Sequence, residues 1–143
     1  MLKMTNEIDD NTNDVILGFF DGDEYIGGAD IEPIRYGEKL LDELNDSIDD
    51  FDGRALRRYN LDGGAYLQDI WVERKHRGNG YFSEMLKMTM DFINEIISDG
   101  SSVVLRAYSE NSNITDDKLA EIYSRYGFVE IQETDDDGII MVK

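Results

Sequence analysis

The sequence reads Arg74-Lys75-His76-Arg77-Gly78-Asn79-Gly80 at the point that decides the fold: four basic or potentially basic residues, then a glycine-rich turn. Residues 65–72 upstream predict a strand, and residues 81–98 downstream predict a helix. A strand, a basic glycine turn and a helix N-terminus together indicate an anion site. Backbone N–H groups point outward there, and the helix dipole favours negative charge. A solvated basic turn is the alternative that this stretch alone leaves open.

Composition narrows the classes of protein and site. The 143 residues fit one domain, and the absence of cysteine excludes disulfides and thiolate metal sites. The single histidine, His76, excludes a multi-histidine metal centre, so no metal is expected. No apolar run approaches the ~18 residues of a membrane span, and the first residues do not form a signal sequence. We therefore expect a cytoplasmic protein without membrane association.

The chain is strongly acidic, with 32 acidic against 14 basic residues and a pI near 4.2. Such a charge repels nucleic acid and attracts cations, so direct nucleic-acid binding is not expected. Three interpretations remain open: ordinary solubility charge, steering of a cationic acceptor, and imitation of nucleic-acid phosphates. Halophilic adaptation is less favoured, because isoleucine, methionine and asparagine are plentiful.

The first half of the chain predicts a hairpin and a helical segment. Residues 1–13 are polar and acidic, which indicates a mobile tail or a frayed first strand. Apolar runs at 15–20 and 24–31 flank a Gly-containing turn and predict a hairpin. Leucines, an isoleucine and a phenylalanine then recur at helical spacing within residues 36–60. We expect a single domain over 14–143, with segment 36–60 inserted before the central strand.

The second half predicts a strand, a helix and a closing hairpin. Residues 102–109 form a strand parallel to 65–72 if the intervening helix is a right-handed crossover. Thr115 is placed to cap a helix that ends at Gly127, and acidic residues in its first turn suit the helix dipole. Residues 128–132 and 139–142 predict the hairpin.

This order of elements, together with two motifs, resembles the GNAT superfamily of N-acetyltransferases. The family signature Arg/Gln-x-x-Gly-x-Gly/Ala falls on Arg77 to Phe82, and a helix closing with Tyr-x-x-x-Gly-Phe falls on Tyr123 to Phe128. The resemblance covers residues 14–143. It implies an α/β (α+β) fold: a mixed, mostly antiparallel sheet with a central parallel strand pair and helices on both faces.

The resemblance also implies acetyl-CoA as the cofactor. The CoA diphosphate would lie on the N–H groups after Arg77, and the pantetheine arm would pair like an extra strand beside the central strand. Tyr123 would protonate the departing thiolate, because the pKa of a phenol, ~10, is close to that of a thiol. A core tyrosine is the alternative. The implied cofactor-binding residues are Trp71, Val72, Arg77, Gly78, Asn79, Gly80, Tyr81 and Phe82.

The sequence departs from the family pattern at two places. Phe82 stands where glycine or alanine is usual, although its backbone N–H remains available. Family members that use a strand base place it at the positions of Tyr66 and Gln68, which we assign to acceptor binding because neither is a convincing base. Asp69 and Glu73 lie off that strand face. A water chain or an already neutral amine would have to replace the base.

The expected function is acetyl-CoA-dependent transfer of an acetyl group to a primary amine of a small molecule or of a protein lysine. The acidic segment 36–60 would suit a cationic acceptor, with a solvated helix face as the alternative. A homodimer is left open. The competing hypothesis is a non-catalytic acidic protein on the same fold that occupies a basic groove of a partner, as a DNA mimic or an inhibitor does.

Overall fold

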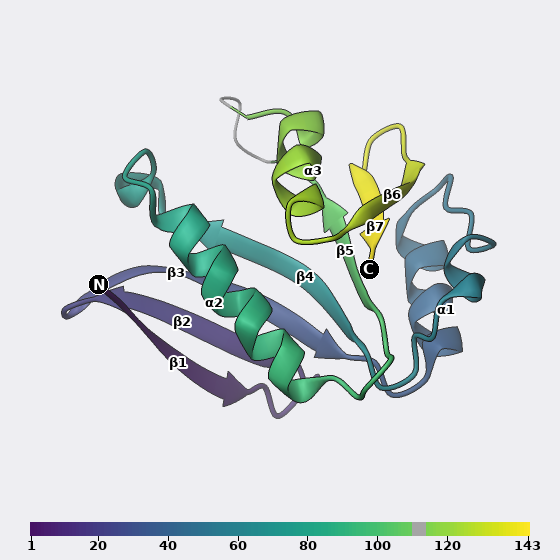
Figure 1. Ribbon diagram of the computed structural model, residues 1–143, viewed down its shortest axis with the longest axis horizontal. Helices are drawn as coiled ribbons and strands as arrows, with labels where there is room; N and C mark the ends of the chain where they lie inside the picture. The colour runs from purple at the N-terminus through teal and green to yellow at the C-terminus, as the bar shows by residue number, and fades with distance from the viewer. Residues whose placement is uncertain (110–113) are drawn as a thin grey trace. The chain divides into compact units, whose positions relative to one another are not determined.

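The computed structural model describes residues 1–109 and 114–143 (Figure 1). No helix in these ranges is both long and apolar enough to cross a membrane. The elements are β1 (Leu2–Ile8), β2 (Val15–Asp21), β3 (Glu24–Pro33), α1 (Gly37–Ser47), the 3-10 turn η1 (Leu56–Arg58), β4 (Ala65–Val72), η2 (Arg74–His76), α2 (Tyr81–Ile96), β5 (Val103–Ala107), α3 (Asp116–Ser124), β6 (Val129–Glu133) and β7 (Ile139–Val142).

The strands join in the order β1-β2-β3-β4-β5-β7-β6, which is a mixed sheet. The pairs β1–β2, β2–β3, β5–β7 and β6–β7 are antiparallel, and β4 and β5 form the parallel pair. The predicted fold class is therefore confirmed. The chain divides into two compact units, residues 1–33 with 67–97 and residues 34–66 with 98–143. The single domain expected over 14–143 stays a prediction.

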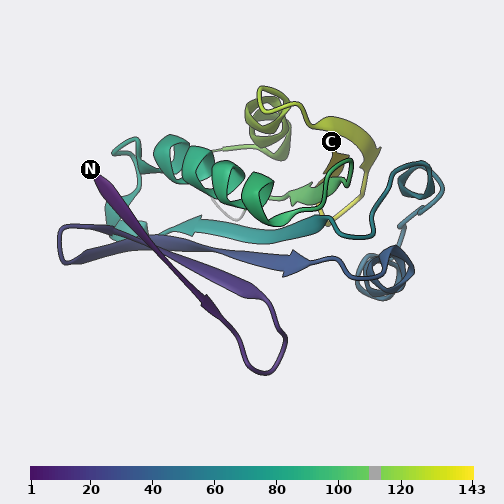
Figure 2. The ribbon, with the colours of Figure 1, turned by 60° about the horizontal axis from the view of Figure 1, so that its bottom comes forward.

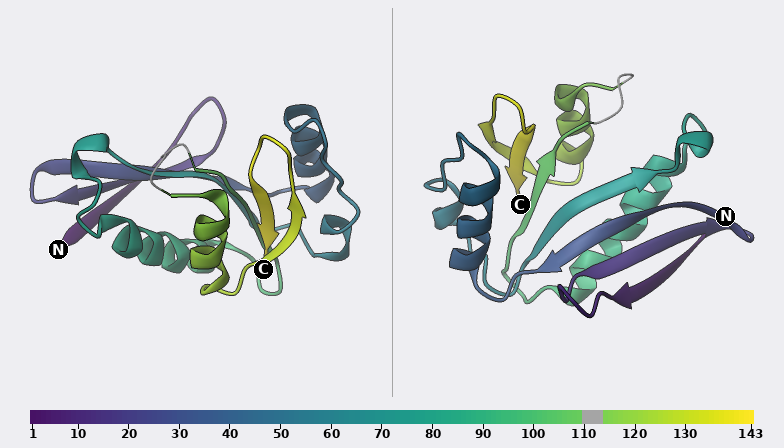
Figure 3. Two further views of the ribbon diagram at one scale, coloured as in Figure 1. Left: turned by 90° about the horizontal axis from the view of Figure 1, so that it is seen from above. Right: turned by 180° about the vertical axis from the view of Figure 1, so that it is seen from behind.

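The first unit contains the strands β1 to β3, most of β4, and α2. Figures 2 and 3 show α2 lying along one face of these strands. Its apolar stripe forms because hydrophobic residues recur at spacings of three and four, so one side of the helix is buried. The fully buried side chains of this unit include Leu17, Phe19, Ile26, Ile31, Met85, Leu86 and Ile93.

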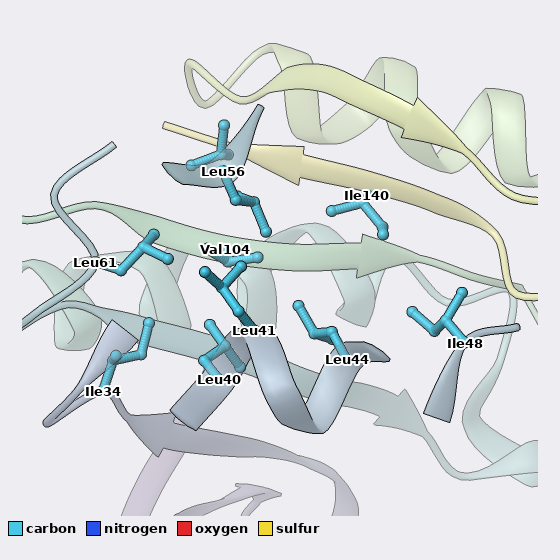
Figure 4. Close-up of a cluster of buried hydrophobic side chains, with 10 residues drawn as sticks. Ile34, Leu40, Leu41, Leu44, Ile48, Leu56, Leu61, Val104 and Ile140 are labelled. Atoms are coloured by element: carbon cyan, nitrogen blue, oxygen red, sulfur yellow. The ribbon is translucent and has the colours of Figure 1, made fainter. Parts of the chain in front are cut away.

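The second unit is built around α1 and the strands β5 and β7 (Figure 4). Leu40, Leu41 and Leu44 line the inner side of α1 and pack in one buried cluster with Val104 of β5 and Ile140 of β7. Thr115 caps α3 as predicted, since its side chain accepts a hydrogen bond from the Lys118 N–H. The segment 36–60 is helical at α1 and η1, as its leucine spacing predicts.

Of the two alternatives expected for residues 1–13, a mobile tail or a frayed first strand, the structure shows a strand over Leu2–Ile8. This segment forms β1 and pairs with β2 along its whole length, from Leu2 opposite Asp21 to Ile8 opposite Val15. An edge strand needs only one partner, so the backbone hydrogen bonds hold a segment whose side chains are mostly exposed. The N–H of Leu2 also donates to Glu84 of α2 at 3.2 Å.

Candidate functional site

The basic turn between β4 and α2 exposes backbone N–H groups beside open space. Gly78 and Gly80 have φ values of +83° and +79°, a left-handed conformation that glycine adopts without steric cost. A Cβ added at either glycine would meet no atom within 4 Å. Gly80 is the N-cap of α2, and within the described chain no side chain caps this helix. The N–H groups of the first turn therefore remain available to an anion.

Three side-chain contacts fix the shape of this turn. Arg77 donates from Nε to the carbonyl oxygen of Val72 at 3.0 Å, and its side chain is otherwise exposed. Asn79 donates from Nδ2 to the carbonyl oxygen of His76 at 3.2 Å. The Tyr81 hydroxyl donates to Asp21 Oδ2 at 2.8 Å, which ties the start of α2 to the β2–β3 hairpin.

The β2–β3 hairpin also holds the basic run through one carboxylate. Glu24 Oε1 lies 2.7 Å from Lys75 Nζ and 3.0 Å from His76 Nε2. Hydrogen bonds from Lys75 and His76 hold the pKa of Glu24 below its usual value, and the pKa of Lys75 is raised by the same carboxylate. Glu24 and Lys75 line a groove together with Tyr25, Glu73 and Arg74.

The strand β4 places the other expected coenzyme and acceptor residues. Trp71 and Val72 are half-buried in the first unit. Gln68 is exposed, and its Nε2 donates to Asp14 Oδ2 at 2.8 Å. Tyr66 belongs to the second unit, where it packs half-buried against the cluster around α1. Tyr66 and Gln68 therefore have different surroundings, although strand alternation assigns them to one face.

Asp14 and Asp30, which sequence reasoning did not single out, lie in the first unit beside Gln68. Asp14 is 8% exposed, and Asp30 Oδ1 is buried with no hydrogen-bond partner among the residues that the structure describes. Burial raises the pKa of Asp30 to about 7, and so do a hydrogen bond that protonated Asp30 donates to Asp14 and the repulsion between the two carboxylates. The available signal was an acidic residue inside an apolar strand, Ile26 to Ile31.

Tyr123 lies on the buried side of α3 in the second unit. It is 3% exposed, and its ring meets that of Phe128 edge to face, with 6.1 Å between ring centroids. The structure thus brings together the tyrosine and the phenylalanine of the Tyr-x-x-x-Gly-Phe motif. This environment is compatible with a core tyrosine as well as with a proton donor, and the role of Tyr123 stays a prediction.

The expected site residues fall into two groups. Those from Gln68 to Phe82 belong to the first unit, whereas Tyr66 and Tyr123 belong to the second. Among residues 1–109 and 114–143, no group of three or more histidine, cysteine, aspartate or glutamate side chains could hold a metal ion. The polar chemistry of the first unit is therefore an exposed cationic turn with free N–H groups, and a partly buried pair of carboxyl groups.

No protein-family model and no curated protein matches the sequence significantly. The structure is similar to an acetyltransferase from Thermus thermophilus (TM-score 0.54, 16% identity, covering 91% of this chain and 63% of that chain). It is also similar to a mosquito arylalkylamine N-acetyltransferase like 5b (TM-score 0.60, 14% identity, covering 90% and 73%). A third similar structure is a tyrosine-to-phenylalanine mutant of the toxin AtaT, bound to the C-terminus of the antitoxin AtaR and acetyl-CoA (TM-score 0.58, 11% identity, covering 99% and 92%). At these identities the likeness establishes the fold, and the chain spans less than two thirds of the Thermus protein.

Proposed function

On the premise that the chain has the GNAT acetyltransferase fold, we propose that it transfers an acetyl group from acetyl-CoA to a primary amine. The observation that supports this most is the turn after β4. Two left-handed glycines and an uncapped helix N-terminus expose N–H groups where the family signature Arg77 to Phe82 lies. A solved neighbour of the same fold, AtaT, holds acetyl-CoA.

The turn is suited to a diphosphate. Backbone N–H groups at the start of α2 and the helix dipole both favour an anion, and Arg77 adds a charge held in place by its bond to Val72. The contacts of Tyr81 with Asp21 and of Lys75 with Glu24 fix the turn before a ligand arrives, which lowers the entropic cost of binding. The nucleotide end of acetyl-CoA is assigned to Gly78, Asn79, Gly80, Tyr81 and Phe82, and its arm to Trp71 and Val72.

The acceptor is assigned as an amine that carries positive charge in solution. The net charge of −18 repels nucleic acid and draws cations to the surface. In the first unit, Asp14, Asp30 and Asp69 concentrate this negative charge beside Gln68, the proposed acceptor residue. Either a small molecule or a protein lysine satisfies this chemistry.

Tyr123 is assigned as the proton donor to the CoA thiolate. Its hydroxyl would give up a proton as the bond between sulfur and the acetyl carbon breaks, and would regain one after transfer. Burial at 3% exposure excludes bulk water from competing for that proton. Removing a general acid typically lowers a rate by 10²–10⁴-fold.

The test combines calorimetry with an assay of free thiol release. Acetyl-CoA is expected to bind the wild type and Tyr123→Phe with equal affinity, whereas Tyr123→Phe lowers amine-dependent thiol release by roughly 100-fold. Tyr126→Phe, on the neighbouring turn, is the matched control and should retain the full rate. The absence of binding heat at millimolar acetyl-CoA would end the proposal, and an unchanged rate in Tyr123→Phe would remove this residue from the mechanism.

A further inference from the structure

We propose that Asp30 binds the ammonium group of the acceptor amine and takes its proton, so that it is the general base which β4 itself does not supply. This inference rests on the proposed function and names the substrate class, an aliphatic primary amine that is charged at neutral pH. Asp30 lies on β3, in the same unit as the basic turn.

Asp30 lies on the strand face opposite α2. A side chain at Gly27 would meet Met85 of α2 at 3.0 Å, whereas one at Gly28 would meet the Trp71 indole ring at 2.6 Å. Side chains alternate along a strand, so Asp30 shares the face of Gly28 and Trp71. Figures 2 and 3 show no helix of the described first unit on this face. Asp30 is itself partly exposed, so an amine can reach its carboxyl group on this face.

One oxygen of the Asp30 carboxyl group is able to accept a hydrogen bond from a ligand. Its Oδ1 is buried and accepts no hydrogen bond from any residue within 1–109 and 114–143. A buried acceptor that lacks a partner is unfavourable by roughly 1–3 kcal/mol, so a bound N–H donor would relieve this cost. Asp14 beside it is already occupied, because it accepts from Gln68 Nε2 at 2.8 Å. Asp30 Oδ1 is therefore an open acceptor for the ammonium.

The groups that face Asp30 raise its pKa, and a raised pKa makes the carboxylate a better general base. Asp14 and Asp9 from the β1–β2 turn and Asp69 from β4 all raise its pKa. Together with burial they place the pKa of Asp30 at about 7. Above that pH the carboxylate is ionised and can accept a proton. Efficient general bases have a pKa near the working pH.

The proton transfer balances without any further reagent. Asp30 accepts one proton from R–NH₃⁺, and the freed nitrogen lone pair forms the C–N bond as the C–S bond breaks. The sulfur takes one proton from Tyr123, and the remaining excess proton on the nitrogen passes through water to the Tyr123 oxygen, which restores the phenol. Per turnover the products are the amide, CoA thiol and one proton that Asp30 releases to water.

Trp71 is the only tryptophan in the chain, so its fluorescence reports on ligands near Asp30. We would titrate n-butylamine, which has the charge of a lysine side chain, into the full chain without acetyl-CoA at pH 8 and pH 5.5. A saturable change is expected at pH 8, with at least a 10-fold weaker apparent affinity at pH 5.5, where Asp30 is protonated. At pH 8 the Asp30→Asn variant should bind n-butylamine at least 10-fold more weakly than the wild type does. Asp91→Asn, on the exposed side of α2, is the control with an equal charge change.

The outcomes separate this inference from the proposed function. Binding that is equal in wild type and Asp30→Asn, independent of pH, or absent in the wild type overturns the role of Asp30. None of these results depends on acetyl-CoA, whose binding is measured separately by calorimetry and should be unchanged in Asp30→Asn. In the thiol-release assay, Asp30→Asn should regain rate with hydroxylamine, which is uncharged at neutral pH. A purely structural role would give the same loss with both acceptors.

Discussion

At the scale of single residues, Gly78 and Gly80 carry the proposed coenzyme site through their backbone. Each has a positive φ, and neither has an atom within 4 Å of the position where a Cβ would lie. The open space beside them is what a phosphate requires for close approach to the N–H groups. Their role is thus conformational, and it can be separated from packing by substitution.

Gly80→Ala tests this role against a matched control at the other end of α2. Gly100 has the same φ of +79° and the same open surroundings, so Gly80→Ala and Gly100→Ala should each destabilise the fold by about 1 kcal/mol. Only Gly80→Ala should weaken acetyl-CoA binding, by roughly 10-fold or more. Thermal unfolding and calorimetry provide the two measurements. An equal loss of coenzyme affinity in both variants would argue that Gly80 has no specific role.

Some residues of the candidate site can be predicted from the sequence alone, and others cannot. Arg77, the glycines and Tyr123 follow from spacing within short motifs, because each motif lies within one turn or one helix. Asp30 could not be found in this way. Its significance depends on Asp14, from the β1–β2 turn, and Asp69, from β4, lying close to it, and strand pairing sets those distances. Gln68 likewise acquires its partner, Asp14, only through the fold.

At the scale of elements, the β2–β3 hairpin supports the basic turn from the side. Asp21 and Glu24 stand at the two ends of this hairpin turn, and they hold Tyr81 and the pair Lys75–His76. Exposed ion pairs of this kind contribute about 0–1 kcal/mol each. Their effect is therefore expected on the local mobility of the turn and not on the stability of the whole chain.

Glu24→Gln should speed hydrogen exchange at the His76 and Arg77 amides, whose bonds to Glu73 and Arg74 form η2. The expected increase is about 2- to 5-fold, in line with the loss of one or two weak ion pairs. Asp23→Asn, the neighbouring exposed carboxylate, is the control and should leave both amides unchanged. Faster exchange in neither variant, or in both to the same degree, would show that Glu24 does not support the turn.

Most helices and strands could be predicted from the sequence. The strand β1 could not, and the reason is physical. β4 and α2 have clear apolar patterns because each buries one side against a core. β1 has none, since its residues are mostly exposed and its stability comes from backbone pairing with β2. Patterns of hydrophobicity report side-chain burial, so a polar edge strand gives little signal.

At the scale of the whole molecule, a strongly acidic chain contains an exposed cationic turn after β4. The charge of −18 disfavours nucleic acids as acceptors and favours cations, whereas the turn after β4 favours an anionic coenzyme. The mixed sheet with its parallel β4–β5 pair is the arrangement that the motif order implied.

The central claim is that N–H groups of the turn bind the diphosphate of acetyl-CoA. The most direct measurement is an amide NMR titration of the ¹⁵N-labelled chain with acetyl-CoA and, separately, with S-acetylpantetheine, which lacks the diphosphate. We predict that acetyl-CoA shifts the amide signals of Gly78, Gly80, Tyr81 and Phe82, and that S-acetylpantetheine leaves them in place. Signals that stay unmoved with acetyl-CoA, or that move equally with both compounds, would contradict the account.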